Sequence, residues 1–178
     1  MLEYQESGLS IGIPDGDSFR FQDNTAYQKL KGQNLAEMDF AWWDASNSTL
    51  YLMDVKDYSH LTPSEKLPEP LLEKLIAKVT DSLMILSSAW IGTNQGQQIK
   101  IDLPTSCQSF PLKPNRLKII FVLKIKNSSL KAELSPLKTR LVNRLQGRLA
   151  LFDLRNVTLV DHEIAINMGI PITEIKTI

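Results

Sequence analysis

Two aspartates and a lysine, Asp39, Asp54 and Lys56, have the types and the spacing to bind a divalent metal ion beside a phosphate group. All three fall on two predicted strands that form a hairpin. Side chains alternate along a strand, so Asp54 and Lys56 share one face and Val55 lies on the other. Neighbouring carboxylates repel each other unless a cation or a proton lies between them. Carboxylate oxygens suit Mg²⁺ or Mn²⁺, and a nearby lysine can hold a water molecule or neutralise a phosphate.

The hydrophobic pattern of the hairpin predicts how its strands pair. If residues 35–44 and 49–58 join through a turn at 47–48, paired residue numbers sum to 95. Asp39 then lies diagonal to Asp54, with roughly 7–8 Å between the backbones. The opposite face collects an apolar set: Met38, Phe40, Trp42, Tyr51, Met53 and Val55. A slip of one residue would mix this set with the charges, so burial argues for the same face as the chemistry does.

This hairpin resembles the motif of a known enzyme superfamily. Residues 37–40 (EMDF) and 50–56 (LYLMDVK) are similar to the PD-(D/E)xK nucleases, which include restriction-endonuclease-like and Holliday-junction-resolving enzymes. Met38 stands where the name of the motif has proline. The resemblance implies an α-β-β-β-α-β core, hydrolysis of DNA phosphodiester bonds and a Mg²⁺ or Mn²⁺ cofactor. Many members are homodimers, so the implied partners are DNA and a second copy of the chain.

The resemblance also implies a role for each residue of the hairpin. Asp39, Asp54 and the backbone carbonyl of Val55 are implied to bind the metal, and Lys56 to assist the attacking water. Many members add a glutamate from their first helix. Candidates for this glutamate are Glu6, Glu3 and Glu37. The lack of a clear counterpart favours an alternative, a nuclease fold that no longer cuts and serves as a binding or assembly module. A third interpretation is an unrelated α/β interaction protein whose hairpin acids face solvent.

Two further groups of basic residues are candidates for substrate binding. On the helix predicted after the hairpin, Lys78 could contact a phosphate, since members of the superfamily often send a polar residue from this helix to the site. Alternatively, Lys74, Lys78 and Asp81 form its solvated face. Further along, Arg140 and Arg144, with Arg148, form a stripe that could follow a phosphate backbone. A solvent-facing stripe is the alternative there too.

The order of predicted elements indicates the fold class. After residues 1–9, a short helix or a loose terminus, the pattern predicts strands, a long helix at 71–90 and a central strand at 117–125. Ser135 and Pro136 resemble the start of a helix that ends near residue 151. The remaining predicted elements are a strand at 18–23, a helical turn at 26–31, a short strand at 98–103 and a strand at 157–160. This order favours an α/β domain with a mixed central sheet flanked by helices. We expect one domain with a core at about 18–160 and an insertion at 92–114; the pattern does not assign residues 164–178.

Charge and composition narrow the class of protein. The net charge is zero, yet residues 1–60 carry ten acids against four bases, and residues 113–148 carry ten bases against one acid. This polarity suits a site that gathers cations and also touches an anionic polymer, or two halves that attract each other. A single cysteine, Cys107, excludes an internal disulfide. The sequence has no apolar run long enough to cross a membrane and no secretory signal, so we expect a cytoplasmic protein without membrane contact.

Overall fold

A five-stranded mixed sheet forms the centre of the molecule. The computed structural model describes residues 1–30, 32–111 and 116–175. The strand order is β3-β4-β5-β6-β7, in which β3, β4 and β5 are antiparallel and β5, β6 and β7 are parallel. Their bounds are Ser18–Phe19, Phe40–Asp44, Thr49–Asp57, Leu117–Lys124 and Thr158–Asp161. This arrangement confirms the predicted α/β class with a mixed sheet flanked by helices.

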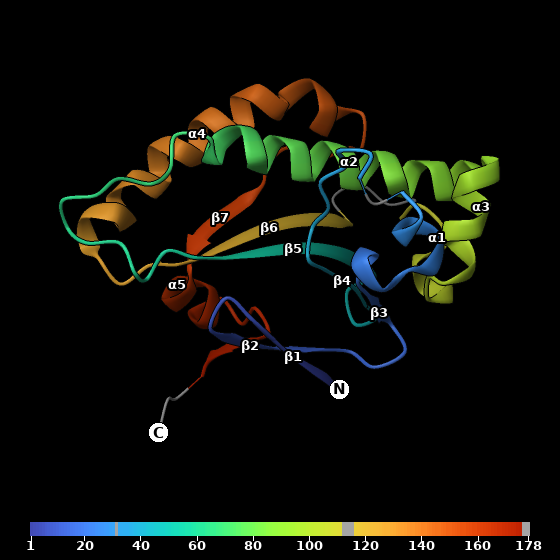
Figure 1. Cartoon of the computed structure of the whole chain (residues 1–178). Helices are drawn as coiled ribbons and strands as arrows, with labels where there is room; N and C mark the ends of the chain where they lie inside the picture. The colour runs from blue at the N-terminus through green and yellow to red at the C-terminus, as the bar shows by residue number, and fades with distance from the viewer. Residues whose placement is uncertain (31, 112–115, 176–178) are drawn as a thin grey trace.

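Two long helices, α2 (Leu71–Ile91) and α4 (Ser128–Ala150), cover one face of this sheet (Figure 1). Each presents an apolar stripe at helical spacing, which is buried against the sheet. On α4 this stripe consists of Leu130, Leu134, Leu137, Leu141, Leu145 and Leu149. Shorter helices lie at one end of the sheet: α1 (Thr25–Gln28), α3 (Asn94–Ile101) and the 3-10 turns η1 (Phe21–Asp23) and η2 (Thr105–Cys107). The larger core therefore lies between the sheet and α2 and α4.

A second, three-stranded sheet covers the other face. Its strands are β1 (Leu2–Glu6), β2 (Leu9–Ile13) and β8 (Ile172–Glu174), and α5 (His162–Asn167) precedes β8. Its apolar side packs on Phe40, Met53 and Val55 of the central sheet. A tight turn with positive φ at Ser7 and Gly8 joins β1 to β2. The prediction of a helix or a loose terminus for residues 1–9 was therefore wrong.

Two more predictions were wrong because each overlooked a residue that caps the start of a helix. Residues 98–103, predicted as a strand, lie mostly in α3, because Thr93 caps this helix by accepting a hydrogen bond from the Gly96 amide. The helix predicted to begin at Ser135 begins at Ser128 instead, because the Asn127 side chain accepts from the amide two residues on.

Pro136 lies inside α4 on an exposed position, where water can satisfy the carbonyl one turn earlier. The strand predicted at 18–23 ends at Phe19, since residues 21–23 form the η1 turn. Residues 112–114 of the expected insertion lie outside the described residues.

Within the described ranges, no single helix is long and apolar enough to cross a membrane. Taken together α2 and α3 reach the required length and apolarity, but they meet at an angle of 94°.

Candidate active site

The β4–β5 hairpin places its acids on the face that α2 covers. The paired residues sum to 93, as in Phe40 with Met53 and Asp44 with Thr49. The predicted sum of 95 was wrong, because the connection is a four-residue loop at 45–48. The Asp44 side chain stabilises this loop by accepting hydrogen bonds from Ser46. A shift of two residues leaves the side chains of the paired strands on their predicted faces. Continued one residue beyond the paired strands, this register sets Asp39 opposite Asp54 instead of diagonal to it.

The apolar face of the hairpin largely follows the prediction. Phe40, Trp42, Tyr51, Met53 and Val55 all face the small sheet. Met38 does not: it packs in the core beneath α2. The reason is that β4 begins only at Phe40, so the strand alternation does not extend back to Met38, whose amide instead donates a 2.8 Å hydrogen bond to Ser82 Oγ on α2.

Two lysines bring their ammonium groups to the paired acids. Lys56 Nζ lies 3.0 Å from Asp54 Oδ1. Lys78 Nζ, from the third turn of α2, lies 2.7 Å from Asp39 Oδ1 and also contacts Asp54 Oδ1. The other oxygen of Asp39 accepts a 3.0 Å hydrogen bond from the Val55 amide. The structure thus brings Asp39, Asp54, Lys56 and Lys78 together in one cluster of two carboxylates and two ammonium groups.

Burial controls the protonation of the acid pair. Asp54 is fully buried, and its Oδ2 has no hydrogen-bond partner among the described residues. Burial, together with the neighbouring charge of Asp39, raises the pKa of Asp54 to about 7. Burial alone would raise the pKa of Asp39 too, but the nearby ammonium groups of Lys78 and Lys56 lower it below its usual range. The two carboxylates oppose the effect of burial on Lys78 and raise its pKa above the usual value.

Neighbouring elements fix the backbone around the cluster. Ser7 Oγ, in the β1–β2 turn, donates a 3.2 Å hydrogen bond to the Val55 carbonyl. Arg20 Nε donates a 3.4 Å hydrogen bond to the Asp39 carbonyl, and its guanidinium lies over the Phe40 ring at 4.7 Å. Tyr58 is half-buried, and its pKa is raised by burial and by the charge of Asp54. Composition and spacing gave no sign of Ser7 or Arg20. The turn between β1 and β2 of the small sheet carries Ser7, whereas Arg20 follows β3, which pairs with β4.

A third carboxylate does not join the pair within the residues that the structure describes. There, no group of three or more His, Cys, Asp or Glu side chains lies within reach of a metal ion. The three candidate glutamates interact elsewhere. Glu6 forms an ion pair with Arg20, and Glu3 and Glu37 accept hydrogen bonds from Ser10 and Tyr27. The prediction of Glu6 as a helix residue was wrong, because it ends strand β1.

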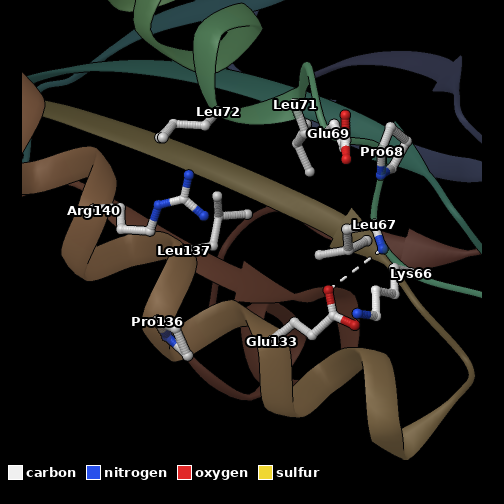
Figure 2. Close-up of a pocket in the computed structure, with 10 residues that line it drawn as sticks. All are labelled: Lys66, Leu67, Pro68, Glu69, Leu71, Leu72, Glu133, Pro136, Leu137 and Arg140. Atoms are coloured by element: carbon white, nitrogen blue, oxygen red, sulfur yellow. Dashed lines mark hydrogen bonds between the residues drawn. The ribbon is translucent and has the colours of Figure 1, made fainter.

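Two arginines of the predicted basic stripe, Arg140 and Arg144, lie on exposed positions of α4. Arg144 pairs with Glu73 of α2 at 3.1 Å. Arg140 lines a cavity of about 480 Å³ between α4 and the chain that leads into α2 (Figure 2). Across that cavity, Glu133 accepts a hydrogen bond from the Leu67 amide. Neither arginine has a hydrogen bond or an ion pair to the four-residue cluster among the described residues.

Lysines on one face of α2 have different environments. Lys74 is exposed, as a solvated face would require. Lys78 turns toward the sheet, and Asp81 accepts a 2.8 Å hydrogen bond from the Ala36 amide. The solvated-face interpretation therefore holds for Lys74 only. The contact of Lys78 with the acids was not visible in the spacing of α2 alone, because it depends on how α2 is rotated over the hairpin.

No protein-family model matches the chain, and neither the curated proteins nor the solved structures give a significant match. The cluster of Asp39, Asp54, Lys56 and Lys78 is therefore the feature that points to a function. Its two carboxylates suit one divalent cation. The Lys78 ammonium contacts one oxygen of each carboxylate, and Asp54 Oδ2, which has no hydrogen-bond partner among the described residues, could serve as a further ligand atom.

Proposed function

We propose that the protein is a metal-dependent nuclease of the PD-(D/E)xK superfamily, which hydrolyses phosphodiester bonds in DNA. The observation that carries the proposal is that Asp39 and Asp54 both contact one positive group, the Lys78 ammonium, with Lys56 beside them. An acid-any-lysine triplet can occur by chance, so the structural context matters, and here Asp39 and Asp54 both contact the ammonium of Lys78.

The order of elements supports the same assignment. The meander β3-β4-β5 leads through α2 to β6, which lies parallel to β5, and this is a β-β-β-α-β arrangement. A restriction-endonuclease-like core has this order with one helix before it. Here the β1–β2 hairpin stands in the place of that helix. The departure removes the usual source of a third acid, while Asp39, Asp54 and Lys56 still lie together at the end of the β4–β5 hairpin.

Mg²⁺ or Mn²⁺ would be held by Asp39, Asp54 and the backbone carbonyl of Val55. When bound, such an ion stabilises the charge that develops on phosphate and lowers the pKa of a bound water. The chain supplies the rest. Asp39 is oriented by the Val55 amide, so its second oxygen is directed toward the site. Lys56 places a positive charge 3.0 Å from Asp54, where it can position the attacking water or stabilise the phosphate.

The proposal is tested by cleavage of plasmid, single-stranded and branched DNA with Mg²⁺ or Mn²⁺. We expect Asp54→Ala and Lys56→Ala each to abolish cleavage while the folded circular dichroism spectrum persists. Matched controls are Asp44→Ala and Lys118→Ala at the opposite end of the sheet, which should cut like the wild type. Cleavage that persists in either site variant, or that does not require metal, would rule out this assignment.

A second function is favoured by one specific observation, the lack of a third acid in the described cluster. The nuclease fold would then serve as a DNA-binding or assembly module without cutting. Calorimetric titration with Mn²⁺ separates the two functions. If the protein is a nuclease, the wild type binds the ion and Asp39→Ala does not. If it is a module without catalysis, neither the wild type nor Asp39→Ala shows heat of metal binding.

A further inference from the structure

Lys78 differs from Lys56 in how it contacts the acids. Lys56 contacts Asp54 alone, whereas Lys78 contacts one oxygen of Asp39 and one of Asp54. Among the lysines that the structure describes, Lys78 alone bridges the pair. A metal ion shared by two carboxylates requires the same bridging position. The ammonium and the ion therefore compete for one place.

The attachment of Lys78 to helix α2 makes this competition effective. Lys78 projects from α2, whose flanking residues Leu75 and Val79 are fully buried, so the helix keeps the ammonium close to the acids. A group held in this way acts at a high effective concentration. The four-carbon stem is flexible, however, and the side chain of Lys78 keeps 16% of its surface exposed. An ion can therefore displace the ammonium without unfolding the helix.

Charge balance determines where the displaced ammonium goes. With both acids ionised, the cluster holds two carboxylates against two ammonium groups. A divalent ion adds two positive charges, which repel the displaced ammonium unless an anion enters with it. A phosphodiester supplies that anion, and a lysine close to the acid pair is well placed to contact it.

We propose that Lys78 is a tethered cation that occupies the metal position between Asp39 and Asp54, so that a divalent ion binds only by displacing it toward the substrate phosphate. The inference rests on the proposed metal-dependent function and adds a competitor to it. It explains how two adjacent carboxylates, one fully buried, are held together in the absence of metal. It also implies that the ion binds more tightly when DNA is present.

The test is calorimetric titration of Mn²⁺ into the wild type, Lys78→Met and Lys74→Met. The first variant removes the competing ammonium, and the second removes an exposed lysine one turn earlier on the same helix. We expect Lys78→Met to bind Mn²⁺ on the order of tenfold more tightly or better, since the ion no longer has to displace a positive charge. Lys74→Met should bind like the wild type. The double variant Lys78→Met with Asp39→Asn should lose the tighter Mn²⁺ binding. This loss would show that the ion binds at the pair of Asp39 and Asp54.

Thermal unfolding gives a readout that does not involve activity. Without metal, Lys78→Met should melt below the wild type because the buried acids lose their shared cation, and saturating Mn²⁺ should restore most of this loss. If the wild type binds Mn²⁺ but Lys78→Met binds it no more tightly, Lys78 is a structural ion pair, and this inference is overturned while the metal site stands. If neither protein binds Mn²⁺, the proposed function fails together with the inference.

Discussion

The contact between α2 and α3 permits a sharp test of the packing, because it depends on a single missing methyl group. Gly96 lies in the first turn of α3 and is buried against the end of α2. A Cβ atom on Gly96 would lie 1.9 Å from the Ser88 carbonyl oxygen and 2.7 Å from the Ala89 amide nitrogen. Real Cβ atoms essentially never approach another heavy atom within 3.0 Å, so Gly96→Ala must push α3 away from α2 by more than an ångström.

The size of the effect depends on the kind of atoms involved. The clashing atoms belong to a helix backbone, which cannot move aside as a flexible side chain can. Overpacking of this kind costs about 1–3 kcal/mol and sometimes more, and a better helix former returns about 1 kcal/mol. Because a backbone clash lies at the upper end of that range, we expect a net loss of about 2 kcal/mol, which for a chain of this size lowers Tm by roughly 4–8 °C.

Gly147 supplies the matched control. It is exposed on α4, and its added Cβ would meet nothing within 4 Å among the described residues. Gly147→Ala should therefore raise the free energy of unfolding by about 0.5–1 kcal/mol through helix propensity alone. Urea and thermal unfolding followed by circular dichroism measure both variants. A Gly96→Ala protein that is as stable as the wild type would refute the close α2–α3 contact and the reasoning built on it.

Two predictions concern titrating groups. Burial raises the pKa of the Cys107 thiol to about 11, so an aromatic disulfide reagent at pH 8 should label it only after urea unfolding; rapid labelling of the native protein would contradict its burial. Burial raises the pKa of Asp54 from 3.8 to about 7, so the folded state holds this proton more tightly than the unfolded state. This stabilisation is complete below the unfolded pKa and is lost as pH rises through the folded pKa. In EDTA, the wild type should therefore lose stability between pH 5 and 8 relative to Asp54→Asn, measured by urea midpoints with Asp44→Asn as control. Parallel curves for wild type and Asp54→Asn would show that Asp54 is already ionised at pH 5.

The sequence specified the faces of the hairpin better than its register. Alternation along β5 places Asp54 and Lys56 on one side, and a shift of β4 by an even number of residues keeps Asp39, the residue just before that strand, on the same side. The register itself depends on the length of the loop at 45–48, which short-range turn preferences do not settle. The same limit explains the wrong placement of Met38, since periodicity does not show where β4 begins.

Long-range packing determined the features that the sequence did not reveal. Lys78 reaches the acids because α2 is rotated by its buried stripe against the sheet, and a lysine one turn earlier remains in solvent. The contact of Ser7 near the site depends on the second sheet, and that of Arg20 depends on the pairing of β3 with β4, across about twenty residues of intervening chain. The helix start at Ser128 was missed because a serine and proline further on mimic the same signal.

The small sheet has a consequence for the order of folding. Residues 9–11 of β2 pair with residues 172–174 of β8, so this contact closes a loop that contains the entire central sheet. Contacts that close large loops lose the most chain entropy and tend to form after local ones. The hairpin, α2 and β6 can assemble from nearby segments, whereas β8 can add to β2 only once the chain has been synthesised almost to its last described residue. During synthesis on the ribosome, the cluster of acids and lysines would therefore form before its second layer is complete, while the side of the sheet that carries Val55 is still only partly covered.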